Sequence, residues 1–137
     1  MAEQITVETF IKAPIEKIWQ YWTEPKHITG WYNASEDWHA PRANNDLKIG
    51  GKFNIRMEAK DGSFGFDFEG KYLNITDNEL IEYTMEDGRY VKTQFMKENE
   101  GYKVTQTFDP ENMNSVEMQK AGWQSILDNF AKYVNEK

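Results

Sequence analysis

The sequence predicts an α+β domain in which a curved antiparallel sheet of six or seven strands wraps around one long C-terminal helix. Residues 52–108 alternate apolar and polar side chains with a period of two, and turn residues interrupt the alternation at intervals. Residues 114–134 instead carry an apolar stripe at helical spacing. The chain of 137 residues shows no internal repeat or linker, so we expect a single domain over residues 1–137.

The N-terminal part of the chain predicts one strand followed by two short helices. Residues 5–11 alternate in polarity, as a strand with one buried face does. Pro14 suits the first turn of a helix, and the apolar residues after it recur at helical spacing: Ile15, Ile18, Trp19 and Trp22. We expect Thr23 to cap a second helix that has Pro25 in its first turn and ends at Gly30. Residues 33–51 are irregular, with a short strand around Trp38.

The turns of the strand region predict the register of the sheet. Asp61-Gly62, Asp77-Asn78 and Asn99-Glu100 suit tight hairpins, while residues 86–88 suit a three-residue loop that ends in a left-handed glycine. Together these turns predict the following opposed pairs: Ile55 with Phe68, Met57 with Phe66, Asn74 with Ile81, Tyr83 with Val91, Thr93 with Gln106, and Phe95 with Val104. Opposed residues share a face, so the apolar side chains of successive strands gather on one side of the sheet.

The last helix is predicted to begin with Asn114 and Glu117 at the spacing of a capping box. A helix is about 10 Å across and strands lie about 4.8 Å apart, so one helix covers only part of such a sheet. The sheet must therefore curl around the helix. We expect space to remain near the less apolar end of the helix, between Met113 and Gly122.

The aromatic side chains of residues 63–72, SFGFDFEGKY, either fill a solid core or line this space. We favour a cavity between the sheet and the C-terminal helix. Its predicted lining is Trp31, Trp38, Ile55, Met57, Phe64, Phe66, Phe68, Tyr83, Thr93, Phe95, Gln106, Met118, Gly122, Trp123 and Leu127. Thr93 and Gln106 form a polar pair on the apolar face, which must be satisfied by mutual bonding, by water or by a ligand.

Three segments resemble the activator of heat-shock protein 90 ATPase homologue branch of the SRPBCC (START-like, birch-pollen-allergen-like) superfamily. They are APIEKIWQYWTEPKHITGWY, NNDLKIGGKF and MNSVEMQKAGWQSILDNFAKYV, and the resemblance covers nearly the whole chain. It implies the helix-grip fold and a deep, mostly apolar cavity. It also implies diverse functions, among them lipid, hormone and polyketide binding, with cyclase or hydrolase activity in some members.

Composition excludes several kinds of chemistry. The chain has no cysteine, which rules out disulfides, thiolate zinc sites and a thiol nucleophile. Its formal net charge of −7 opposes binding to nucleic acid and to acidic membranes. His27 and His39 do not stand at metal-ligand spacing, so we assign no metal, no cofactor and no catalytic residue. The N-terminus resembles no signal peptide and no apolar run is long enough to span a membrane, so we expect a cytoplasmic protein.

Binding of a small hydrophobic or aromatic molecule is the function that the sequence favours. One alternative is a cyclase- or hydrolase-like enzyme acting on such a molecule, with His39, paired with Glu36 or Asp37, or a pocket tyrosine as its acid or base. Another is a stress-response module that binds a chaperone. The resemblance covers only the C-terminal domain of the eukaryotic activator. We therefore expect this chain alone not to stimulate a heat-shock protein 90 ATPase strongly.

Overall fold

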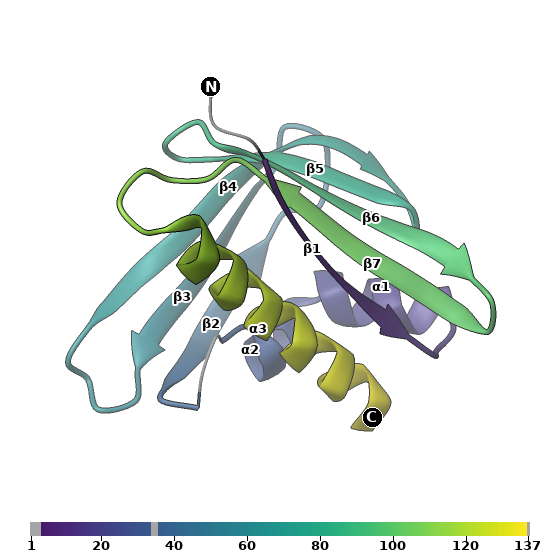
Figure 1. Ribbon diagram of the computed structural model, residues 1–137, viewed down its shortest axis with the longest axis horizontal. Coiled ribbons are helices and arrows are strands. Elements are labelled where there is room, and N and C mark those ends of the chain that lie inside the picture. Colours follow the sequence, from purple (N-terminus) through teal and green to yellow (C-terminus); the bar gives the residue numbers. More distant parts are fainter. Residues whose placement is uncertain (1–3, 34–35, 137) are drawn as a thin grey trace.

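The computed structural model describes residues 4–33 and 36–136. Its elements, in chain order, are β1 (Ile5–Ile11), α1 (Ile15–Thr23), α2 (Pro25–Trp31), β2 (Trp38–Asn45), β3 (Lys52–Ala59), β4 (Gly65–Thr76), β5 (Leu80–Met85), β6 (Tyr90–Glu98), β7 (Gly101–Phe108) and α3 (Val116–Glu136) (Figure 1). The predicted α+β class, the long C-terminal helix and the two short helices after the first strand are confirmed.

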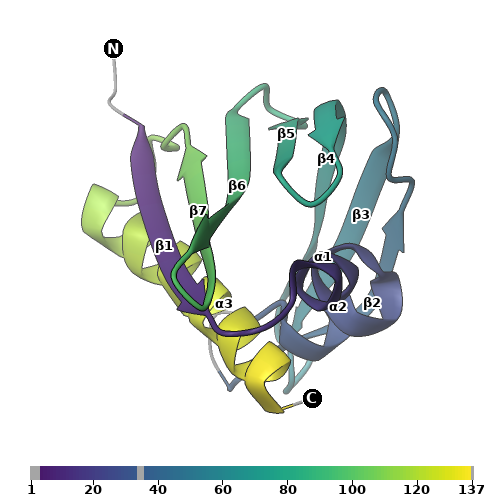
Figure 2. The same cartoon turned by 90° about the vertical axis from the view of Figure 1, so that its right-hand side faces the viewer.

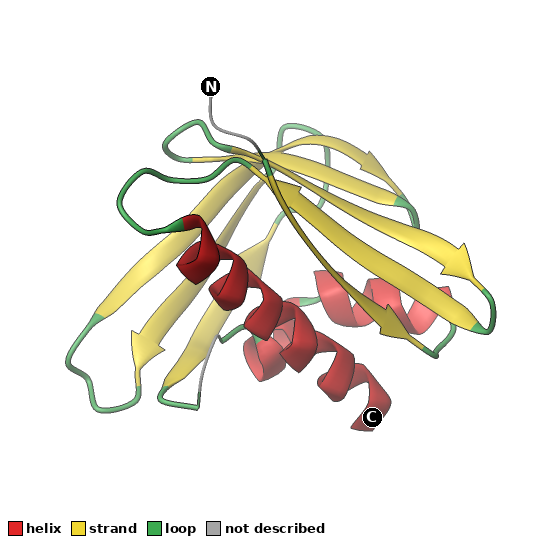
Figure 3. Cartoon of the chain, in the orientation of Figure 1, coloured by secondary structure: helices red, strands yellow, loops and turns green. Residues whose placement is uncertain are grey.

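The strands form one antiparallel sheet of seven strands in the order β1-β7-β6-β5-β4-β3-β2. The sheet curls into a half-barrel, with β1 and β2 at its two edges (Figure 2). α3 runs along the concave side, and α1 and α2 lie at the end of the sheet where α3 finishes (Figure 3). The predicted helix-grip arrangement is therefore present.

Most of the predicted register is confirmed. Met57 opposes Phe66, Tyr83 opposes Val91, and Thr93 opposes Gln106. The three-residue loop is also confirmed, because Gly88 has a φ of 91° and the amide of Met85 donates to the carbonyl of Arg89. These pairings place alternate apolar residues of β3 to β7 on the concave face.

The predicted pairing of Asn74 with Ile81 is wrong. The register between β4 and β5 shifts between Tyr72 and Asn74, so that Asn74 opposes Glu82 and Ile75 opposes Ile81. The irregularity is a β-bulge, which adds one residue to one strand of a pair. It turns Asn74 to water, where its amide donates to Glu82, and moves the apolar Ile75 to the face of Ile81. Burial of an isoleucine thus overrides the simplest hairpin register.

The ends of α2 also differ from expectation. Thr23 is the last residue of α1, where its hydroxyl donates to the Trp19 carbonyl at 2.8 Å, and Glu24 occupies the N-cap of α2. The helix continues through Gly30 to the buried Trp31. A Cβ at Gly30 would lie 2.5 Å from Cε1 of Tyr133, so this glycine permits close packing against α3 and does not end the helix.

The start of α3 lies one residue later than predicted. Ser115 immediately precedes the helix, and its hydroxyl accepts a hydrogen bond from the Met118 amide at 3.1 Å. This is the bond of an N-cap residue. The predicted capping role of Asn114 is therefore wrong. Asn114 belongs to the preceding loop, where its carbonyl accepts from Gln119.

Candidate functional site

A pocket of about 390 Å³ opens between the N-terminal half of α3 and the strands β3 and β4. Its walls are mostly apolar and consist of Met57, Phe66, Phe68, Met85, Met118, Gly122, Trp123 and Ile126. Its polar groups are Tyr32, Arg89, Gln106, Glu111, Asn114 and Gln119. The volume and the mixture of apolar walls with a few polar groups are typical of small-molecule sites.

The pocket exists because the short helices cover only one half of α3. Trp22 and Trp31 pack their rings on Phe130 of α3 at centroid distances of 4.8 and 4.7 Å. The first half of α3 has no such cover. This open half contains Gly122, where a Cβ would have no atom within 4 Å apart from its own helix backbone and chain neighbours. The helix backbone therefore borders open space.

Aromatic rings form the wall beside Gly122. Trp123 stacks on Phe108 with ring centroids 3.8 Å apart and planes 11° from parallel. Phe68 meets Trp123 edge to face at 6.4 Å and the Tyr32 ring at 5.8 Å. These contacts pack the rings against one another.

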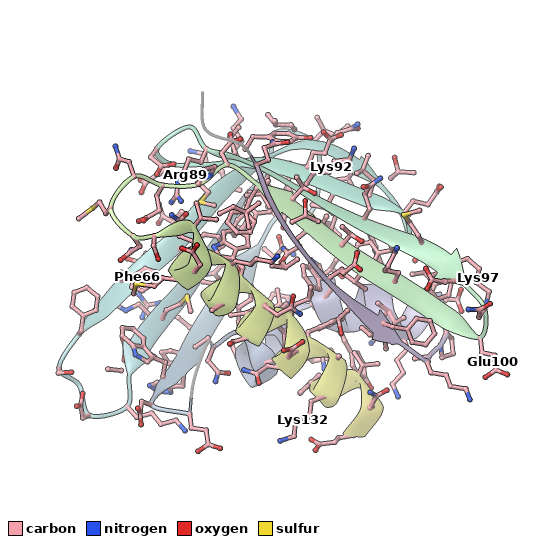
Figure 4. The ribbon with its side chains drawn as sticks, in the orientation of Figure 1. Phe66, Arg89, Lys92, Lys97, Glu100 and Lys132 are labelled. Atoms are coloured by element: carbon pink, nitrogen blue, oxygen red, sulfur yellow. The ribbon has the colours of Figure 1, made fainter. Side chains whose placement is uncertain are left out.

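The mouth of the pocket carries exposed apolar side chains. Phe66 is 41% exposed and Met118 is 65% exposed, although both line the pocket. Phe64 lies outside the lining and packs on Trp38 at 5.9 Å and on Phe66 at 6.3 Å. Figure 4 shows Phe66 and Arg89 on the side of the molecule where α3 begins, far from Lys132 near its other end.

A second, smaller cavity of about 40 Å³ lies deeper in the domain. Tyr32 and Gln106 line both cavities, so they separate the inner space from the outer pocket. The inner lining also includes Tyr72 and Tyr83, together with Asn45. A space of this size with several hydroxyl and amide groups suits a buried water molecule.

The tyrosine hydroxyls of this inner cavity are held in their neutral form. Burial raises the pKa of Tyr32 and of Tyr72, and raises that of Tyr83 well above its ordinary value. Tyr83 hydrogen-bonds to Tyr32, and the Tyr72 hydroxyl donates to Asn45 Oδ1. The Tyr32 ring is nevertheless partly exposed, because it faces the outer pocket while its hydroxyl lies in the buried cluster.

The predicted polar pair is present at the same depth. Gln106 Nε2 donates to Thr93 Oγ1 at 3.2 Å, and both side chains are buried. Thr93 accepts this bond and lines neither cavity. Gln106 lines both cavities and retains further hydrogen-bonding capacity.

The structure divides the predicted lining residues into three groups. Seven line the outer pocket: Met57, Phe66, Phe68, Gln106, Met118, Gly122 and Trp123. Trp31, Ile55 and Tyr83 line the inner cavity, again with Gln106. Trp38, Phe64, Thr93, Phe95 and Leu127 line neither. Of these, Phe95 packs on Trp19 at 5.4 Å and on Trp22 at 5.7 Å, and Leu127 is fully buried in the core.

The predicted lining left out several residues of the outer pocket, including Tyr32, Met85 and the loop before α3. Met85 belongs to the alternating apolar set of the sheet, which was the signal that could have identified it. Hydrogen bonds from Gln119, a buried residue of α3, hold this loop beside the pocket. Gln119 Oε1 accepts from the Glu111 amide at 2.8 Å, and its Nε2 donates to the carbonyls of Glu111 and Asn114 at 3.1 and 2.9 Å.

Two charged residues, Arg89 and Glu111, belong to the lining of the pocket. Arg89 donates to Asp87 at 2.7 Å, and Glu111 accepts from the Asn114 amide at 2.6 Å. His39 opposes Glu58 on the outer face of the sheet, with Nε2 4.0 Å from its carboxylate, so it does not serve the pocket as an acid or base.

The part of the chain that the structure describes holds no group of His, Cys, Asp and Glu suited to a metal ion. No described helix combines the length and apolar character that a membrane span requires.

A curved sheet that grips a long helix and leaves an apolar pocket beside it defines a helix-grip domain of the ligand-binding type. The chain belongs to the family of activator of Hsp90 ATPase homolog 1-like proteins, whose family model matches residues 12–135.

Two solved structures are similar over nearly the whole chain. An AHSA1-like protein from Aeromonas hydrophila is 43% identical, with a TM-score of 0.91 over 97% of this chain and 92% of that one. A protein from Cytophaga hutchinsonii is 48% identical, with a TM-score of 0.85 over 98% of this chain and 94% of that one.

A protein from Nitrosomonas europaea shares only the fold, at 18% identity and a TM-score of 0.82 over 98% of this chain and 95% of that one. No curated protein matches the chain.

Proposed function

We propose that this protein binds a small, uncharged apolar or aromatic molecule in the pocket between α3 and strands β3 and β4. The observation that carries the proposal is the open space at Gly122. A glycine inside a helix destabilises it by about 1 kcal/mol relative to alanine, and no neighbouring atom explains its presence here. A ligand that occupies this space would explain it.

The walls favour a molecule with an apolar body. Phe68 and Trp123 offer ring surfaces, while Met57 and Met85 are flexible side chains that adapt to irregular shapes. The formal net charge of −7 opposes nucleic acid and acidic lipid surfaces as partners. The size of the pocket suits a small molecule.

Binding of a neutral apolar dye, N-phenylnaphthylamine, tests the proposal by fluorescence titration. The wild-type protein should bind the dye and enhance its emission. Gly122→Leu should weaken binding at least about tenfold, because an isobutyl group fills the space that one face of the dye would occupy. Native mass spectrometry of freshly purified protein should additionally show a bound small molecule.

Ala121→Leu is the matched control, because it places the same side chain on the exposed face of the same helix. This variant should bind the dye as the wild type does. If the wild type binds no dye and carries no small molecule, or if both leucine variants bind equally well, the proposed site is wrong.

A further inference from the structure

We infer that the ligand is an aromatic alcohol whose neutral hydroxyl group binds the side-chain amide of Gln106. The inference rests on the proposed function and specifies the chemistry of the same pocket. Gln106 is a polar side chain that lies between the apolar outer pocket and the inner cavity.

Gln106 has one hydrogen-bond partner within the described residues, Thr93 at 3.2 Å. A primary amide offers two N–H donors and an oxygen with two acceptor sites. One bond therefore leaves most of this capacity unused, although the side chain is only 4% exposed. Its free end borders both cavities. Buried polar groups are normally satisfied, so this amide calls for water or a ligand.

The unused capacity suits a hydroxyl group. The nitrogen and oxygen of an amide exchange places when the group rotates by half a turn, and either atom can face Thr93. The atom that faces the pocket is then either a donor or an acceptor. A hydroxyl both donates and accepts, so it binds in either case, whereas an ether only accepts.

The surroundings favour a neutral head group. Burial keeps the hydroxyls of Tyr32 and Tyr83 neutral, since it raises the pKa of both. The charged residues of the lining are Arg89 and Glu111. Arg89 is already paired with Asp87. A carboxylate beside Gln106 would therefore lose its hydration, and the one cation of the lining, Arg89, already has a carboxylate partner, so a neutral group is favoured there.

The remaining walls of the pocket determine the shape of the apolar part of the ligand. Gly122 exposes the helix backbone along one side, and Phe68 and Trp123 present ring surfaces nearby. A planar ring system fits between these groups with its hydroxyl directed inward to Gln106. Aromatic ring contacts of this kind add to the free energy of burial.

Naphthalene derivatives substituted at one ring position test the inference by titration calorimetry. Naphthol should bind about tenfold more tightly than methylnaphthalene, which has nearly the same size but forms no hydrogen bond. Methoxynaphthalene, whose oxygen only accepts, should bind no more tightly than naphthol, and naphthoate should bind most weakly. These comparisons need only the wild-type protein.

Gln106→Met removes the amide while keeping the length of the side chain. It should reduce the preference for naphthol over methylnaphthalene to less than about twofold, with methylnaphthalene affinity unchanged. Thr93→Val is the control, because it removes the partner and leaves the amide in the pocket, so the preference should persist.

Equal binding of naphthol and methylnaphthalene by the wild type would overturn the inference while leaving the proposed site intact. Tightest binding of naphthoate, or a preference that survives in Gln106→Met, would also overturn it. Failure of every probe to bind would count against both the inference and the proposed function.

Discussion

Gly70 is the residue at which the alternation of aromatic side chains along β4 stops, and Phe53 explains why. A Cβ at Gly70 would lie 2.5 Å from Cε2 and 2.6 Å from Cζ of the Phe53 ring. Phe53 and Gly70 are opposed in the register of β3 and β4. The ring of one strand thus occupies the space that a side chain of the other would need.

Gly70→Ala should therefore destabilise the protein by about 1–3 kcal/mol, because the new methyl group forces the Phe53 ring away from its packed position. Chemical denaturation followed by tryptophan fluorescence measures the change. Gly122→Ala is the matched control. It has free space around it and a helical backbone, so it should raise the stability by up to about 1 kcal/mol. A loss of stability in both variants, or in neither, would contradict this explanation.

Phe66→Ala should reduce stability by less than about 2 kcal/mol, because part of the side chain borders the pocket and solvent. Phe95→Ala provides the comparison, since Phe95 is 4% exposed and packs among tryptophans. Its loss should reach the range of about 3–5 kcal/mol that is typical of a buried phenylalanine. Equal losses in the two variants, measured by urea denaturation, would mean that Phe66 is ordinary core.

The different positions of Phe66 and Phe95 show how far the sequence predicts individual residues. Alternation correctly places both on the concave face of the sheet. Alternation does not reveal which part of that face the short helices cover. Phe95 lies under α1 and Phe66 lies at the open end, a difference that depends on how separate elements dock.

At the scale of elements, Gln119 connects α3 to the loop that forms one wall of the pocket mouth. Its side chain makes three hydrogen bonds to the backbone of Glu111 and Asn114. Gln119→Met should release this loop. Hydrogen exchange of the Glu111 amide, measured by NMR, should become about tenfold faster, which corresponds to the loss of one net hydrogen bond.

The amides of β5 provide the internal control for this variant, because they lie in the sheet and should exchange at unchanged rates. If the Glu111 amide exchanges equally fast in the wild type and the variant, Gln119 does not hold the loop. If every amide exchanges faster, the variant has lost global stability and the local explanation is wrong.

The elements themselves were largely predictable, because periodicity and turn residues act over short distances along the chain. The strands from β3 to β7 and the long helix follow from such patterns. The bulge in β4, the N-cap at Ser115 and the bonds of Gln119 do not. The bulge depends on the burial of Ile75 beside Ile81, and the bonds of Gln119 depend on how the loop folds back on α3. The N-cap is a local bond, but Asn114 and Ser115 are both good capping residues and the sequence does not decide between them.

At the scale of the whole molecule, the inner tyrosines couple stability to alkaline pH. Tyr32, Tyr72 and Tyr83 come from three different segments and meet around the inner cavity. Burial raises the pKa of each. Below about pH 10, the ordinary pKa of tyrosine, both the folded and the unfolded chain keep these protons and the full stability is present. Above it, only the unfolded chain releases them.

The free energy of unfolding should therefore fall as the pH rises from about 10 towards the raised values, by about 1.4 kcal/mol per pH unit for each such tyrosine. Tyr72→Phe removes one of these groups, so its slope should be smaller by about 1.4 kcal/mol per pH unit. The variant also loses the bond to Asn45, which lowers its stability at every pH but leaves the difference in slope unchanged. Urea denaturation at closely spaced pH values measures the slope for the wild type and for the variant. Between about pH 7 and 9 the two stability curves should run parallel, because no tyrosine titrates there in either state. Equal slopes above pH 10 would show that Tyr72 ionises as readily in the folded protein as in the unfolded chain, and that the inner cavity is open to water.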